Sequence, residues 1–236
     1  MVIYNFKEHQ VYGSLPVEKK LGILVVDDHQ LILTGTLDVL RRKYPEADIV
    51  KAQTKQETLS LIQSSNLDLV VMDLSIPNTL GERAEIETGI QLLQTLLAEY
   101  PHQNFIVQTS YVKALIRIKH EIDNHQGGFA IADKGLPEDE MLMRVNLALS
   151  GATHTKDIKT GIELKPEWVD VLRFAFEEGL TDKEIAKRMY KSERAVRTYW
   201  TKIQDVLEVY PEDCKQSGKN LRIQTEIRAR EEGLID

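Results

Sequence analysis

The sequence has almost no cysteine and no long apolar run. Its single cysteine, Cys214, excludes an intramolecular disulfide and a cysteine-rich metal site, so we expect a reducing, cytoplasmic setting. No apolar run approaches the roughly 20 residues that a membrane-spanning helix needs. The N-terminus also lacks the basic, apolar and small-residue succession of a signal peptide. These absences predict a cytoplasmic protein without a membrane partner.

A strong excess of basic residues is missing as well. The 236 residues carry a formal net charge of −7, which excludes a wholly basic nucleic-acid coat protein but leaves room for a local basic patch. Hydrophobic residues make up 42% of the chain, which is enough for ordinary cores. The length predicts two domains.

Composition separates the chain into four segments. Residues 1–20 show no periodicity, and we expect an N-terminal extension there. Residues 21–149 alternate apolar runs with helical patterns, whereas residues 150–163 are small, polar and glycine-bearing, which is typical of a linker. Residues 164–236 show no strand pattern, so we expect a small all-α domain there.

The first of these domains is predicted to have an α/β fold. Short apolar runs predict strands near residues 21–26, 47–52, 67–73, 105–109 and 129–132. The patterns between them predict helices near residues 30–43, 54–63, 89–99, 111–124 and 137–149. This alternation predicts a five-stranded, doubly wound parallel sheet with the strand order 2-1-3-4-5.

Acidic residues end two strands of the predicted sheet. Asp27 and Asp28 follow the first strand, and Asp73 ends the third. These strands are neighbours in the expected order, so the carboxylates converge at one edge, where such sheets bind ligands. Carboxylates so close together repel unless a cation such as Mg²⁺ offsets them. Thr109, which ends the fourth strand, places a hydroxyl at the same edge; an aspartate that merely starts a turn is the simpler alternative for Asp73.

Two classes of enzyme place their sites at the same kind of edge. A phosphatase of the haloacid dehalogenase type needs a second acid two residues after its nucleophile, and Ser75 occupies that position. A dinucleotide site needs G-x-G-x-x-G after a strand, and no strand here is followed by one. We therefore expect no enzyme of either class.

The acidic edge resembles the receiver domain of two-component response regulators. The matching residues are Asp27-Asp28-His29, Asp73 with Pro77, Thr109 and Gly128-Phe129. The resemblance implies that Asp73 accepts a phosphoryl group from a sensor histidine kinase. It implies that the Mg²⁺ ligands are Asp27, Asp28, Asp73 and the main-chain carbonyl of Ser75. It also implies that Thr109 and Phe129 are the switch pair that senses the phosphoryl group.

Two features depart from the pattern of this family. The family has a lysine three residues after the switch aromatic, where this chain has Ala132. Lys134, two residues later, needs a local bulge or loop to contact the phosphoryl group, and is otherwise a surface lysine. The segment 78–88 also makes the loop after Asp73 longer than the family's usual loop.

The second domain has the signals of a helix-turn-helix. Pro166 and Gly179 bracket one helix, Thr181 to Glu184 form a capping box that begins the next, and Ser192 is placed to cap a third. Between residues 183 and 202 seven basic residues stand against two acids, a local charge of +5. A solvated helix face is the alternative explanation for this charge.

This stretch resembles the LuxR-type helix-turn-helix. The matching residues are Lys183-Glu184-Ile185-Ala186, Ser192, Val196 and Leu207-Glu208-Val209. The resemblance implies that Arg197, Thr198 and Thr201 contact base edges. Lys183, Arg194 and Lys202 are the candidates for phosphate contacts.

Both domains thus resemble response regulators of the NarL/FixJ class. The resemblance implies a transcription regulator that binds double-stranded DNA, acts as a homodimer and is phosphorylated on Asp73. Two alternatives stay open, namely a regulator that works without phosphorylation and a receiver-based adaptor whose helical domain binds protein. A longer polar segment at 210–219, before a helix expected near 220–232, puts the geometry of the dimer in question.

Overall fold

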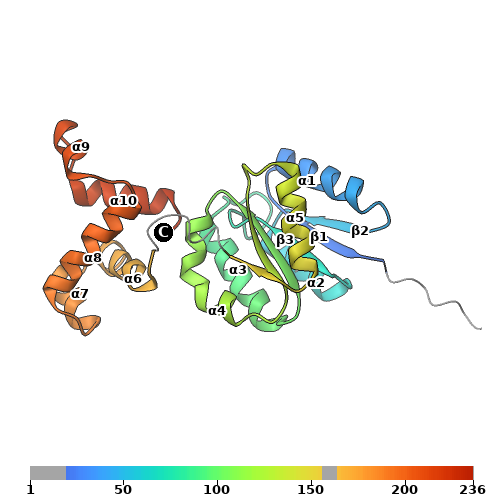
Figure 1. Cartoon of the computed structure of the whole chain (residues 1–236), viewed down its shortest axis with the longest axis horizontal. Helices are drawn as coiled ribbons and strands as arrows, with labels where there is room; N and C mark the ends of the chain where they lie inside the picture. Colours follow the sequence, from blue (N-terminus) through green and yellow to red (C-terminus); the bar gives the residue numbers. More distant parts are fainter. Residues whose placement is uncertain (1–19, 156–163, 236) are drawn as a thin grey trace, which may run out of the picture.

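The computed structural model describes residues 20–155 and 164–235. Figure 1 shows an α/β domain and a helical domain, with the end of the chain lying between them. The expected N-terminal extension up to residue 19, and residues 156–163 of the expected linker, lie outside the described ranges. None of the helices in these ranges is long and apolar enough to cross a membrane.

A parallel sheet forms the centre of the first domain. Its strands are β1 (Gly22–Val26), β2 (Asp48–Ala52), β3 (Leu69–Met72), β4 (Asn104–Thr109), β5 (Phe129–Asp133) and β6 (Thr153–His154). Their order is β2-β1-β3-β4-β5-β6, which confirms the order expected for the first five strands. All residues of β1 and β3 are buried, because helices cover both faces of such a sheet.

The sixth strand corrects the prediction of five strands. Thr153 and His154 fall inside the expected linker, yet they pair with the start of β5. The chain turns back at Gly151, whose φ of 76° is a left-handed conformation that glycine adopts without strain. Two residues are too few to give a periodic signal in the sequence, so the expected linker began too early.

Six helical segments surround the sheet. They are α1 (Gln30–Lys43), α2 (Lys55–Ser64), α3 (Ile86–Glu99), the 3₁₀ helix η1 (Val112–Ile118), α4 (Lys119–Asn124) and α5 (Glu138–Leu149). Two hydrophobic clusters fill the space on either side of the sheet. The single helix expected over 111–124 is in fact divided at Ile118, and its first half is 3₁₀.

The long loop after β3 is tied to the body of the domain. The amide groups of Lys55 and Gln56, at the start of α2, donate hydrogen bonds to the carbonyl oxygens of Pro77 and Asn78. Ile76 and Glu85 pair as an isolated antiparallel bridge, which closes the loop at its base. The residues between β3 and α3 therefore form a loop that these hydrogen bonds hold next to the carboxyl ends of the strands.

The second domain is all-helical, as expected. Its helices are α6 (Pro166–Phe176), α7 (Asp182–Arg188), α8 (Glu193–Val206), α9 (Pro211–Gln216) and α10 (Leu221–Glu231). The capping box of Thr181 with Glu184 forms at the start of α7, and the Ser192 side chain caps α8. The polar segment 210–219 contains the short helix α9, which the sequence did not predict.

Candidate functional site

The acidic residues converge at the carboxyl ends of β1 and β3. The two strands run in register, with Val26 beside Met72, so the residues that follow them are also neighbours. The amide of Asp73 donates a 2.9 Å hydrogen bond to the carbonyl of Val26. One ligand atom from each of Asp27, Asp28, His29 and Asp73 lies within 4.8 Å of the others.

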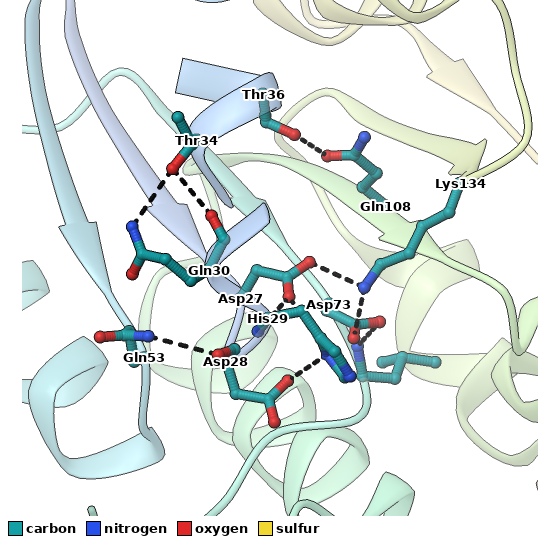
Figure 2. A network of polar contacts seen from close by, with 11 residues as sticks. Asp27, Asp28, His29, Gln30, Thr34, Thr36, Gln53, Asp73, Gln108 and Lys134 are labelled. Carbon is teal, nitrogen blue, oxygen red and sulfur yellow. Dashed lines mark hydrogen bonds and ion pairs between the residues drawn. The ribbon is translucent and has the colours of Figure 1, made fainter. Parts of the chain in front are cut away.

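Lys134 is the cation of this pocket. Its Nζ lies 2.7 Å from Asp27 Oδ2 and 2.8 Å from Asp73 Oδ2 (Figure 2). All three side chains are largely buried, so water screens the ion pairs little. The Lys134 amide also donates to the Thr109 carbonyl, which places the lysine at the ends of both β4 and β5.

The structure resolves the choice between Ala132 and Lys134. Ala132 is fully buried in the hydrophobic cluster that also holds Ala130 and Met141, so its side chain has apolar neighbours. Lys134 lies just beyond β5, which ends at Asp133, and its backbone is free of the strand alternation. The turn that follows β5 is the local loop that allows Lys134 to reach the acidic residues.

Burial and the ion pairs act against each other in setting the pKa values of the pocket. Burial raises the pKa of the Asp27 carboxyl above its ordinary value, although the hydrogen bond and ion pair with Lys134 act to lower it. Burial also acts to lower the pKa of Lys134, but its bonds to Asp27 and Asp73 outweigh that effect and leave the pKa raised. Lys134 is therefore charged at neutral pH.

The donor set of the pocket fits a hard divalent cation. Asp28 Oδ1 is buried and, although it lies 2.7 Å from His29 Nδ1, the two atoms are not aligned for a hydrogen bond. Within the described residues no donor bonds to the Ser75 carbonyl, two residues after Asp73. Three carboxylates face one lysine, so negative charge remains. The cluster of Asp27, Asp28 and Asp73, together with the Ser75 carbonyl, thus offers the oxygen ligands that Mg²⁺ prefers.

The six expected DNA-contacting residues lie on α7 and α8 of the second domain. All are exposed: Lys183, Arg194, Arg197, Thr198, Thr201 and Lys202. Arg197 pairs with Glu193 at 3.4 Å and Lys202 with Asp205 at 3.8 Å, and such exposed pairs contribute little. A base edge at Arg197 or a phosphate group at Lys202 can therefore replace these carboxylates at small cost.

The acidic pocket and its sheet match a known family model. The model described as "Response regulator receiver domain" matches residues 23–146, which is more than half of the chain. The chain belongs to the response regulator receiver family. The matched range begins at the second residue of β1, includes β2 to β5, and holds the pocket of Asp27, Asp73 and Lys134.

Related transcriptional regulators align with both domains. The chain is 25% identical to the DNA-binding transcriptional activator DevR/DosR of Mycobacterium tuberculosis, over 77% of this chain and 85% of that protein. It is 27% identical to the uncharacterized transcriptional regulatory protein YhcZ of Bacillus subtilis, over 80% of this chain and 90% of that protein. These relatives confirm the resemblance to the NarL/FixJ class.

Solved structures share the two-domain fold. A structure of an RcsB–DNA complex has a TM-score of 0.55 and 18% identity, and covers 90% of this chain and 98% of its own. RcsB from Salmonella enterica serovar Typhimurium, bound to promoter rprA, has a TM-score of 0.53 and 19% identity, and covers 84% and 98%. At this identity the likeness concerns the fold.

The receiver places Thr109 at the pocket but Phe129 elsewhere. The register of β4 with β5 sets Thr109 beside Asp133, whereas Phe129 pairs with Phe105 at the other end of β5. The expected switch pair of Thr109 and Phe129 is therefore not formed. The family has its switch residue three residues before the lysine. Because the lysine of this pocket is Lys134, the residue at the switch position is Ile131 and not Phe129. Ile131 is an aliphatic diagonal neighbour of Thr109 on the same face of the sheet.

Thr109 is linked directly to η1. Its Oγ1 accepts a 3.2 Å hydrogen bond from the Tyr111 amide, one residue before η1 begins, and the side chain is fully buried. The seven residues of η1 exceed the three or four that 3₁₀ helices usually have, and such segments often mark hinges. A change at Thr109 would therefore act on the start of η1.

The helix η1 and the C-terminal tail, which comprises residues 232–235 after α10, join the two domains. Ile116 is 4% exposed because it packs into the hydrophobic cluster of the second domain, next to α6. Lys113 pairs with Glu232 at 3.1 Å, and Arg117 bonds to Glu87 and to the Gly233 carbonyl. We call this set of contacts the junction.

The tail approaches the receiver very closely. A Cβ at Gly233 would lie 2.9 Å from Ile86 Cδ1 and 3.1 Å from Ala114 Cβ, so a larger residue would push the tail away. Leu234 and Ile235 beyond it are buried. The junction was not predicted, and its one signal in the sequence is the Gly-Leu-Ile run after a charged helix.

Proposed function

We propose that this protein is a transcriptional response regulator in which phosphorylation of Asp73 by a histidine kinase controls DNA binding or dimerisation by the second domain. The observation that carries the proposal is the bridge from Lys134 to Asp27 and Asp73, beside a buried oxygen of Asp28 that accepts no hydrogen bond. A strand-end aspartate held by a buried lysine is prepared to carry further negative charge.

The phosphoryl transfer needs a nucleophile and charge neutralisation. A carboxylate oxygen of Asp73 forms a bond to phosphorus while the bond from phosphorus to a kinase histidine nitrogen breaks. The electron pair stays on that nitrogen, which takes up a proton. Lys134 holds Asp73 in place and offsets the added charge. Mg²⁺ held by Asp28, Asp73 and the Ser75 carbonyl would supply further positive charge for the phosphoryl oxygens.

Thr109 is the residue that can pass the signal on. Its hydroxyl lies at the pocket edge and now accepts from the Tyr111 amide. Rotation of this hydroxyl toward a phosphoryl oxygen removes that hydrogen bond, so the start of η1 must move. Since η1 carries Lys113, Ile116 and Arg117, its movement loosens the junction.

The exposure of the six DNA-contacting residues limits how the control can work. The junction uses η1, α6 and the tail, and leaves α7 and the outer face of α8 accessible. Control therefore acts on the placement of the second domain, or on its pairing with another copy, and not by covering the helix. Exposed Ile223 and Ile227, one turn apart on α10, suit a contact between two copies, and one related structure holds two RcsB dimers on DNA.

One observation favours a second candidate function. Ile131 stands three residues before Lys134, where the family has an aromatic switch residue. An aliphatic side chain is held by packing alone, so Thr109 can move without a matching rotation of its neighbour. A regulator that binds DNA without phosphorylation is therefore the alternative.

The DNA-binding part of the proposal has a direct test. The full chain is incubated with a random-sequence duplex library, a selected duplex is recovered, and its affinity is measured between about 50 and 200 mM salt. We expect a steep loss with salt, and a further loss in the variant Arg197→Ala with Lys202→Ala. The matched control is Arg41→Ala with Lys43→Ala on α1, which should bind like the wild type. Equal binding by both double variants would contradict the proposal.

A further inference from the structure

Tyr190 has a backbone conformation that its residue type disfavours. Its φ is 55°, and it lies between α7 and α8, in the turn of the helix-turn-helix. The fold demands this conformation, because α7 ends with the Tyr190 amide donating to the Lys187 carbonyl and the Lys191 amide donating to the Ala186 carbonyl. Such an ending puts the residue after the cap in the left-handed region, where glycine is the usual residue.

The chain uses glycine at most comparable positions. Among the described residues, the left-handed residues that follow α5, α6, α9 and α10 are Gly151, Gly179, Gly218 and Gly233. Only Tyr190 after α7 and Glu208 after α8 carry side chains. Glu208 is one of the acids near Arg228, whose pKa is raised first by its hydrogen bond with Glu231 and then by the charges of Glu232 and Glu208.

No contact within the protein accounts for the tyrosine. Its side chain is 96% exposed, so burial does not offset the strain. It forms no hydrogen bond, ion pair or ring contact with any other part of the chain that the structure describes. A bulky residue kept in a strained, fully exposed position is typical of a site that touches a ligand.

The position of Tyr190 indicates which part of the ligand it meets. In a helix-turn-helix the first helix crosses the DNA backbone and the second enters the major groove with its N-terminal residues. Tyr190 lies after α7 and two residues before Ser192, the cap of α8. This point lies at the edge of the groove, where the phosphates run. Its sequence neighbours Arg188 and Lys191 are exposed and basic, as such an edge requires.

We propose that Tyr190 contacts the DNA backbone, with its phenol hydroxyl donating a hydrogen bond to a phosphate oxygen at the edge of the groove. The inference rests on the proposed DNA binding and adds one contact to it. Tyrosine is among the side chains that bond to phosphates, and such bonds position the protein without reading sequence. Because the phenol is neutral, it adds affinity without releasing a counterion.

The test measures the affinity of Tyr190→Phe for the selected duplex and for a mixed-sequence duplex over a range of salt concentrations. We expect about a tenfold loss on both, the usual size for a hydrogen bond to a charged group. The slope of log K against log salt should stay at its wild-type value, whereas Lys183→Ala should reduce it by about one. Tyr210→Phe, which removes an exposed phenol beyond α8, should bind like the wild type.

A second variant separates binding from folding. Tyr190→Gly relieves the left-handed strain, so its folded-to-unfolded ratio should be at least that of the wild type, yet it should bind DNA at least tenfold more weakly. Glu208→Gly makes the same change after α8 and should keep its affinity. Wild-type affinity in Tyr190→Phe, or a loss confined to the selected duplex, overturns the inference. If the wild type itself shows no salt-dependent binding, the proposed function fails, and this inference with it.

Discussion

Lys134 is the residue on which the charge balance of the pocket depends. Its ammonium pairs with two carboxylates that are 5% and 2% exposed in their side chains. Removing one partner of such buried ion pairs leaves uncompensated charge, which is costlier than never having formed the pair. The charge balance of the pocket therefore depends on Lys134 as well as on the aspartates.

The variant Lys134→Ala should lower the free energy of unfolding by roughly 3 kcal/mol, because Asp27 and Asp73 are left buried and unpaired. Urea denaturation monitored by circular dichroism measures this change. The control is Lys134→Ala combined with Ala132→Lys, which restores the lysine at the position that the family pattern suggests. Since position 132 faces the hydrophobic cluster of Ala130 and Met141, this double variant should be no more stable than the single one. Recovery of stability would contradict the placement of Lys134.

The acids of the site could be predicted from the sequence, but their partners could not. Asp27 and Asp73 each follow a buried apolar run and Thr109 ends β4, and in a parallel sheet such ends meet at one edge. The reach of Lys134 depends on where β5 stops, which the sequence does not show. Phe129 was expected at the pocket because the family pattern was aligned on Gly128-Phe129, whereas the lysine that reaches the pocket is Lys134.

Among the elements, η1 connects the pocket to the second domain. The sequence of residues 111–124 has one helical period, so a single helix was expected. The structure divides it because Ile116 and Ile118 face different partners, the second domain and the receiver core. A pattern in one chain segment cannot reveal that its two apolar residues serve two domains. The tail that completes the junction was unpredictable for the same reason.

The variant Ile116→Ala should loosen the junction and leave the receiver intact. The lost packing weakens the docking of the second domain by about 2 kcal/mol. Hydrogen exchange of the Leu234 and Ile235 amides, near the junction, should become faster. The matched control is Ile118→Ala, which removes the same atoms from the receiver core and should instead destabilise the whole receiver. Unchanged exchange in Ile116→Ala would show that the junction does not hold the tail.

The whole molecule gathers its basic charge in one part of the second domain. The segment 183–202 carries +5, although residues 164–236 as a whole carry −1, and residues 21–149 carry −7. An acidic receiver repels DNA, whereas the basic helices attract it. A second domain that moves freely therefore presents its basic helices to DNA while the acidic receiver stays away from the DNA. The two-domain plan was predictable from the sequence, while the contacts between the domains were not.

Phosphorylation of the full chain tests the central claim most directly. The protein is incubated with acetyl phosphate and Mg²⁺, and both the hydroxylamine-labile phosphoryl adduct and the affinity for the selected duplex are measured. We predict an adduct on Asp73 that is lost in Asp73→Asn and after chelation of Mg²⁺, together with a rise in DNA affinity of roughly 5- to 150-fold. A chain that takes up no phosphoryl group, or one whose labelling persists in Asp73→Asn, would contradict the account.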